Sequence, residues 1–190
     1  MMSAEIHPLN GNWAYFYTQY REGQTWQSSL NTLAENIASV EDFWRAVRAV
    51  HFPAALKRNE GYFLFKTGIK PMWEDPINQG GGRILLEFPN RRLSEDDARV
   101  NKRLDDAWKN LMMALVGEQF SDMVSKYICG AAVGRKKKSD KISLWLTAEA
   151  DEQVRNKLKS ELARKLNIRK RIAMPYESHA SAQKRITQGF

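Results

Sequence analysis

Two periods of hydrophobic residues run along this chain, and together they predict a mixed α+β fold. Runs rich in aromatic and β-branched residues, bounded by Gly, Pro or charged residues, are typical of strands. Such runs lie at residues 12–20, 32–37, 61–66, 83–88, 127–133, 141–147 and 171–176. They do not alternate strictly with helices, which favours an antiparallel, strongly curved sheet with helices packed on one of its faces.

Three segments repeat their apolar residues with the period of a helix. The first follows Ser39, a residue type suited to the N-cap. The second follows a charged connector, with about three turns expected, and ends at Gly117. The third covers residues 151–168. Their apolar faces are Val40, Phe43, Trp44, Val47 and Val50; Leu104, Trp108, Leu111, Met112 and Leu115; and Val154, Leu158, Leu162 and Leu166.

Length and composition indicate one domain over residues 1–190, with flexible ends expected at 1–10 and 181–190. Thirty Lys and Arg against 22 Asp and Glu give a net charge of +8, which favours a polyanionic partner such as nucleic acid. The single cysteine, Cys129, excludes an internal disulfide. Neither a membrane span nor a secretory signal is visible, so we expect a cytoplasmic protein, with some nuclear presence allowed.

The residue types of catalysis and metal binding are not arranged for either task. None of the three histidines, His7, His51 and His179, has a partner at the spacing of a metal site. No nucleophile elbow is present, and the carboxylates are spread along the chain. We therefore expect a protein that is not an enzyme and that needs neither a metal nor a cofactor.

The segment "KTGIKPMWEDPINQGGGR", residues 66–83, must be a loop, because it contains two prolines and three consecutive glycines. It nevertheless holds Trp73 directly before Glu74. Trp26 lies in a second polar loop, "REGQTWQSS". One interpretation makes each indole a lid over the hydrophobic core, and it stays open at this point.

The other interpretation is a slot for a flat ring between two parallel indoles. An indole face is the best aromatic partner for a cation. Glu74 at the edge of the slot would accept hydrogen bonds from ring N–H and amino groups, and Arg83 with the basic residues 135–141 would hold phosphates. A cationic base with donors on one edge and several phosphates is 7-methylguanosine triphosphate, the messenger RNA cap.

These segments also carry a resemblance. The order "HPLNGNWA", "TWQSSL", "SVEDFW", "LFKTGIKPMWEDPINQGGGR", "VGEQF", "CGAAV", "KSDKISLW" and "YESHA" resembles the eukaryotic translation initiation factor 4E family over roughly residues 7–180. The combination of "PMWED", the downstream GG-R and "DKIxxW" is specific. The resemblance implies a single curved antiparallel sheet of about eight strands, three helices on its convex face, and the cap in the concave face.

By the family motifs, the cap-binding residues are Trp26, Trp73, Glu74, Arg83, Lys136, Lys141 and Trp145. Trp26 and Trp73 would stack on the base, Glu74 would pair with its edge, and Trp145 would touch the methyl group. The basic residues would contact phosphates. Lys136 stands where the family has an arginine, and Arg135 and Lys138 remain alternatives for that contact.

The resemblance further implies a scaffold protein or 4E-binding protein that docks a helix of the type Tyr-x4-Leu-Leu on the convex face. The residues expected to bind it are His7, Pro8, Val40, Trp44 and Met113. Lys109 and Asn110 replace the Leu and Glu that the family usually has, and a charged insertion around residues 93–101 precedes the second helix. We expect a changed partner preference, in a protein that is otherwise a monomer.

The resulting hypothesis is a module that binds the cap and recruits mRNA for translation initiation. A homologue that represses translation or serves as a specialised factor, with altered scaffold binding, is the alternative within the family. A decapping hydrolase and a sequence-tolerant binder of single-stranded RNA are the alternatives outside it.

Overall fold

The computed structural model describes residues 5–21, 23–89, 97–136, 139–168 and 172–187. Within them, seven strands form one sheet in the order β2-β1-β3-β5-β6-β4-β7, and every neighbouring pair is antiparallel. The strands are β1 (Pro8–Gln19), β2 (Leu30–Ser39), β3 (Glu60–Lys66), β4 (Gly82–Pro89), β5 (Ile128–Gly134), β6 (Ser139–Leu146) and β7 (Tyr176–Ser178). The α+β class and the single antiparallel sheet are confirmed, with seven strands in place of about eight.

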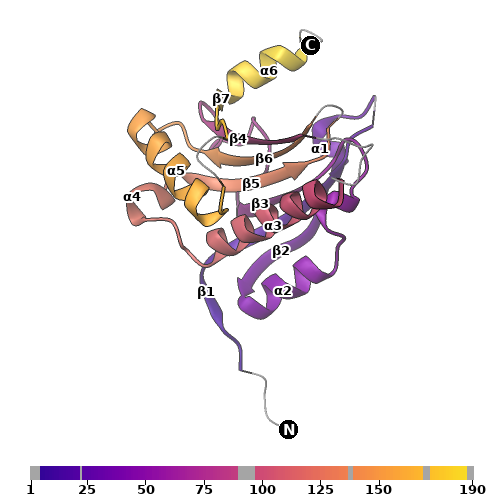
Figure 1. Cartoon of the computed structure of the whole chain (residues 1–190), viewed down its shortest axis with the longest axis vertical. Helices are drawn as coiled ribbons and strands as arrows, with labels where there is room; N and C mark the ends of the chain where they lie inside the picture. The colour runs from indigo at the N-terminus through magenta and orange to yellow at the C-terminus, as the bar shows by residue number, and fades with distance from the viewer. Residues whose placement is uncertain (1–4, 22, 90–96, 137–138, 169–171, 188–190) are drawn as a thin grey trace.

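Three helices pack on one face of this sheet, and Figure 1 shows the longest of them lying over the strands. These are α2 (Val40–Arg48), α3 (Asp97–Val116) and α5 (Glu152–Lys165). Ser39 caps α2 as predicted, because its side chain accepts a hydrogen bond from the backbone N–H of Asp42. The remaining helical elements are α1 (Trp26–Ser29), the 3₁₀ turn η1 (Pro53–Ala55), α4 (Asp122–Ser125) and α6 (His179–Thr187).

Alternation along the strands divides the apolar residues between two clusters. On β1 and β3, Tyr15 and Leu64 pack in the main core against the helices, whereas Phe16 and Phe65 point to the opposite face. The smaller group on that opposite face is named the Trp145 cluster here. It consists of Ala14, Phe16, Phe63, Phe65, Cys129, Ala132 and Trp145, all of them buried. Because both faces are apolar, the central strands read as nearly continuous hydrophobic runs.

Three predictions about element bounds were wrong. The helix α3 has 20 residues, far more than about three turns. Of the predicted strand 171–176, the described residues 172–175 are not in a strand, because Pro175 has no N–H to donate and ladder pairing begins only at Tyr176. Residues 181–187, expected to belong to a flexible end, are helical, since α6 reaches Thr187. His179 and Ala182 anchor α6 by full burial, a signal too small to see in a polar segment.

The chain also differs from the prediction at its start, where Pro8 already belongs to β1. Among the described helices, none combines the length and apolar character that crossing a membrane requires.

Candidate functional site

The strand register brings the predicted site residues into rows on the face that carries the Trp145 cluster. Residues directly opposite one another in neighbouring strands point to the same face. One row crosses β1, β3, β5, β6, β4 and β7 through Ala14, Phe65, Gly130, Trp145, Arg83 and Glu177. A second row crosses β5, β6 and β4 through Gly134, Lys141 and Glu87. Each of these residues is four positions away from the residue of the first row on the same strand. Trp145, Arg83 and Lys141 therefore lie on one face.

Gly130 has a specific function in this arrangement. A Cβ atom there would lie 2.5 Å from both the carbonyl oxygen of Leu64 and the Cγ of Phe65, so no larger residue fits without moving the backbone of β3. The rings of Phe65 and Trp145 instead meet edge to face across β5, with centroids 5.4 Å apart. Trp145, only 3% exposed, is fixed further by its Nε1–H, which donates to the Ser143 hydroxyl at 3.3 Å.

The two loop tryptophans converge on the Trp145 cluster from separate segments. Both Trp26 and Trp73 are half-buried, and both pack against it. Trp26 begins α1, the turn that the Thr25 side chain caps, and meets Phe63 edge to face at 5.5 Å. Its Nε1–H donates to the carbonyl of Pro71 at 2.9 Å. That bond joins Trp26 to the loop that carries Trp73, which follows Pro71 by two residues.

Two polar side chains fix the loop around Trp73. Asp75 accepts from the backbone N–H groups of Lys70 and Ile77 at 2.9 and 3.0 Å. Asn78 is completely buried, and its Nδ2 donates to the carbonyls of Lys70 and Met72 at 2.8 Å each. Such Asx contacts are ordinary turn chemistry. Sequence reasoning missed both residues, although Asp and Asn between prolines and glycines are the signal that identifies them.

In the part of the chain that the structure describes, two polar groups of this loop, the Glu74 carboxylate and the Trp73 Nε1–H, are not used to hold its fold. Glu74 is exposed, and its backbone carbonyl accepts from the Gln79 side chain at 3.2 Å. The Trp73 Nε1–H is buried and has no hydrogen-bond partner among the described residues. The loop thus presents a half-buried indole with an exposed carboxylate directly after it.

Cations surround one end of the row. Arg83 donates from Nε and Nη2 to Glu177 at 3.0 and 2.8 Å, and Lys141 pairs with Glu87 at 2.8 Å. Desolvation of its ammonium, followed by repulsion from Arg83 and Lys141, lowers the pKa of the otherwise exposed Lys136. Three of the predicted phosphate contacts therefore share one electrostatic environment.

The two alternatives to Lys136 for the phosphate contact are Arg135 and Lys138. Arg135 is buried, pairs with Asp140 at 2.9 Å, and donates to the carbonyl of Ala54. Its buried guanidinium is therefore used at least in part for contacts in the interior. Lys138 lies outside the described residues.

His179 is a site residue that the sequence did not single out. Its ring lies 4.3 Å from the ring of Trp145, centroid to centroid, and is 3% exposed. Neither ring nitrogen has a hydrogen-bond partner among the described residues. Burial, followed by the positive charge of Arg83, lowers the pKa of His179 to about 4, so the imidazole is neutral beside the indole. Only the fold reveals this contact.

Four of the five predicted partner-binding residues lie on or beside the first part of α2. His7 bonds to Glu41 through its backbone N–H and its Nδ1, at 3.1 and 2.8 Å, and these bonds lower the pKa of Glu41 to about 2. The neighbouring Pro8 begins β1 opposite Ser39. A surface hollow on α2 is lined by Val40 and Trp44, with Glu41, Arg45, Arg48 and Ala49.

Met113 does not line that hollow. It lies half-buried on α3, against the main core, and Lys109 on the same helix pairs with Asp106 at 3.7 Å.

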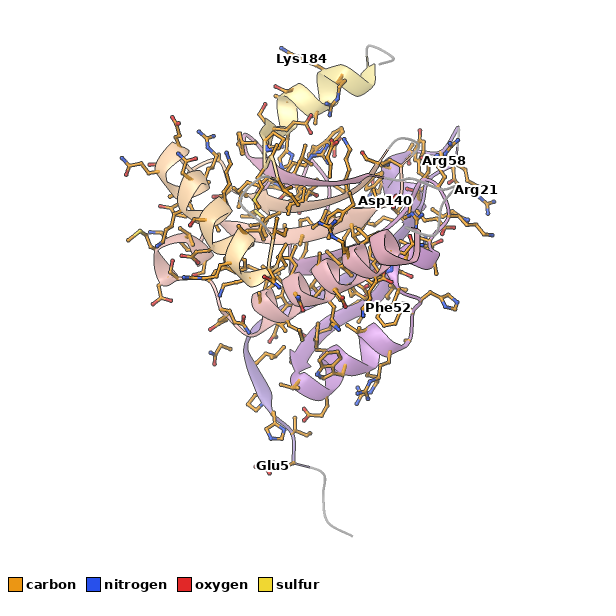
Figure 2. All side chains as sticks on the ribbon, viewed as in Figure 1. Glu5, Arg21, Phe52, Arg58, Asp140 and Lys184 are labelled. Carbon is orange, nitrogen blue, oxygen red and sulfur yellow. The ribbon has the colours of Figure 1, made fainter. Side chains whose placement is uncertain are left out.

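Figure 2 labels Glu5, close to His7, at one end of the molecule and Lys184 of α6 at the other. The N-terminal segment and α6 are therefore far apart. Within the described residues, no group of three metal-ligating side chains exists.

Comparison with known proteins decides the family. A family model described as Eukaryotic initiation factor 4E matches residues 8–189. This chain belongs to that family. Eukaryotic translation initiation factor 4E-3 of Caenorhabditis elegans is 37% identical, over 94% of this chain and 69% of the relative. Eukaryotic translation initiation factor 4E of Homo sapiens is 33% identical, over 92% of this chain and 76% of the relative.

Solved structures of initiation factor 4E proteins share the fold. Caenorhabditis elegans eIF4E-3, in complex with the 4E-binding protein Mextli, gives a TM-score of 0.84 at 37% identity, covering 95% of this chain and 97% of that chain. Ascaris suum eIF4E-3 in complex with the m7G cap gives 0.83 at 36% identity, covering 92% of each. The resemblance noted from the motifs is confirmed.

Proposed function

We propose that this protein binds the 7-methylguanosine cap of mRNA and presents the mRNA for translation initiation in the cytoplasm. The observation that carries the proposal is the convergence of Trp26 and Trp73 on the Trp145 cluster, beside the cations Arg83 and Lys141. The similar Ascaris suum protein has been solved with the m7G cap, which supports the same ligand class here.

Each side chain has a defined task in this proposal. Trp26 and Trp73 stack on the two faces of the cationic base, which contributes on the order of 1–3 kcal/mol per stacking contact, and the methyl charge adds a cation–π attraction. Glu74 accepts hydrogen bonds from the guanine edge. Trp145, at the floor of the cluster, contacts the methyl group.

Phosphates bind at the cationic end of the row, to Arg83, Lys136 and Lys141. These contacts are charge-assisted hydrogen bonds. Nothing in this set activates water or supplies a nucleophile, so the proposed activity is recognition without catalysis. A cap dinucleotide incubated with the protein is expected to stay intact, and its cleavage would identify a hydrolase instead.

One titration tests cap binding directly. Intrinsic tryptophan fluorescence is followed while 7-methyl-GTP or GTP is added. Stronger quenching and tighter binding by 7-methyl-GTP are expected, because only the methylated purine carries the positive charge that an indole pair favours. Equal affinity for the two nucleotides would contradict the proposal and identify a general binder of RNA.

A second surface of the proposed function is the hollow around Val40 and Trp44, together with His7, Pro8 and Met113. The Caenorhabditis elegans relative has been solved with the 4E-binding protein Mextli, which supports a partner helix here. Lys109 and Asn110 change the preference among such helices. A pull-down with a Tyr-x4-Leu-Leu peptide tests this surface: binding that Trp44→Ala abolishes supports recruitment of mRNA to a scaffold, and no binding favours the repressor alternative.

A further inference from the structure

Two of the cations assigned to phosphate are already paired with carboxylates that lie directly across the sheet. Arg83 on β4 is opposite Glu177 on β7, and Lys141 on β6 is opposite Glu87 on β4. The contacts are short: 2.8 Å from Arg83 Nη2 to Glu177 Oε2, and 2.8 Å from Lys141 Nζ to Glu87 Oε1. A phosphate that approaches either cation therefore meets a carboxylate beside it.

Glu177 makes more contacts with cations than Glu87 does, and it is less exposed to solvent. Its Oε2 takes both the Nε and the Nη2 donors of Arg83, the pair that an arginine uses for a two-point contact with phosphate. Its Oε1 accepts from Arg185 on α6, so one carboxylate joins two guanidinium groups. The Glu177 side chain is only 12% exposed, whereas that of Glu87 is 52% exposed. Water and salt screen the charge of Glu177 less.

The site stays cationic despite these carboxylates. Among the described residues that form these ion pairs, the three cations Arg83, Lys141 and Arg185 outnumber the two carboxylates Glu177 and Glu87. Desolvation is the main cause of the lowered pKa of Lys136, and the positive charges of Arg83 and Lys141 lower it further. Phosphate is still attracted, but the attraction is reduced by the negative charges within the row.

We propose that Glu177, with a weaker contribution from Glu87, is a specificity-determining residue that competes with phosphate for the cations. It limits how much each added phosphate strengthens binding. The inference rests on the proposed function, since it concerns the phosphate end of the same cap site. Its consequence is a protein that recognises the methylated base strongly and the length of the phosphate chain weakly.

The test compares 7-methyl-GTP with 7-methyl-GMP. Dissociation constants for both are measured by tryptophan fluorescence, at low and at physiological ionic strength, for the unmodified protein and for Glu177→Gln. The amide keeps the size of the side chain and removes its charge. The preference for the triphosphate is expected to rise about 3- to 10-fold, the size of effect for removing one partly screened like charge. Its salt dependence is expected to steepen.

Glu35→Gln is the matched control, because Glu35 is exposed on β2 at the opposite edge of the sheet and the change in net charge is the same. The preference is expected to stay unchanged in this variant. Glu87→Gln is the second test variant, on an exposed residue that does not endanger folding. It is expected to raise the preference in the same direction and by less.

Each possible change in the preference for the triphosphate either supports or overturns the inference. An unchanged preference in both Glu177→Gln and Glu87→Gln overturns the inference, and a reduced preference in Glu177→Gln shows that Glu177 only holds Arg83 in position. Should Glu177→Gln fail to fold, an unchanged preference in Glu87→Gln overturns the inference and a rise supports it. If the unmodified protein binds neither nucleotide, the proposed function itself has failed.

Discussion

The Nε1–H of Trp26 donates to the carbonyl of Pro71 at 2.9 Å, and this single bond connects the two loops that carry the candidate stacking residues. Trp26 lies in α1 and Trp73 in the loop after β3, 47 positions further along the chain by their numbers. The bond joins segments that the strand ladder does not, and so it holds the Trp26 side chain against the loop that carries Trp73. A hydrogen bond of this kind contributes about 0.5–1.5 kcal/mol to stability.

Replacing either indole is expected to abolish cap retention. Trp26→Ala and Trp73→Ala each remove one stacking face, worth on the order of 1–3 kcal/mol before the cation–π contribution. The measurement is retention on immobilised 7-methyl-GTP, with circular dichroism to verify folding. Trp44→Ala, on the helix-covered side of the sheet, is the control and should be retained. Retention of both loop variants would refute the paired stacking.

Phenylalanine substitutions separate stacking from loop positioning. Both keep an aromatic face, but only Trp26→Phe loses a hydrogen bond, because the Trp73 N–H has no partner among the described residues. Trp26→Phe is therefore expected to weaken 7-methyl-GTP binding more than Trp73→Phe. The reverse order in a fluorescence titration would argue against a positioning role for the bond to Pro71.

Glu74→Gln is expected to weaken 7-methyl-GTP binding about 10- to 100-fold. The exposed carboxylate is the proposed acceptor for the guanine edge, and a hydrogen bond to a charged group contributes about 1.5–3 kcal/mol. Calorimetry with 7-methyl-GTP measures the change, and Glu35→Gln controls for net charge. A loss below about twofold, or an equal loss in the control, would remove Glu74 from the site.

Asn78→Ala is expected to loosen the loop that carries Trp73. The substitution leaves the carbonyls of Lys70 and Met72 without their donor, at a cost of about 1–3 kcal/mol for each buried group. Faster backbone hydrogen exchange over residues 70–81 and weaker 7-methyl-GTP binding should appear together. Gln79→Ala, an exposed neighbour with one longer bond, should change neither. Unaltered exchange in Asn78→Ala would mean that Asp75 alone maintains the loop.

The neutral His179 beside Trp145 predicts that stability falls with acidification. Its folded pKa of about 4 lies below the ordinary value of 6.5, so the unfolded chain binds the proton more tightly. The stabilisation is fully present above pH 6.5 and is lost as the pH falls towards 4. The loss reaches on the order of 3 kcal/mol.

Urea denaturation at several pH values between 7.5 and 4 checks this prediction. His179→Gln cannot titrate, so its stability should decline less over that range than that of the unmodified protein. Carboxylates with lowered pKa values, such as Glu41 and Glu87, titrate in both proteins and do not affect the difference. Parallel curves for the two proteins would exclude His179 as the titrating group.

Local patterns determined much of this protein from sequence alone. The two-residue period on β1 and β3 and the helical period of α2 are set by contacts between near neighbours, and the Ser39 cap lies within one turn of the helix it starts. Trp26, Trp73 and Glu74 could be proposed as site residues because a large indole in a polar loop is unusual. The order of these motifs along the chain also indicated the family.

The tertiary structure alone decided which groups face each other. Arg83 and Glu177 are 94 positions apart, and only the antiparallel register of β4 with β7 sets them side by side. Just after β5, the fold buries Arg135 and leaves Lys136 exposed, a difference that two adjacent basic residues in the sequence do not reveal. The helix α6 depends on two buried side chains that no periodicity reveals. Register and burial depend on how distant segments pack, and for this reason the carboxylates of the phosphate end could not be predicted from their neighbours in sequence.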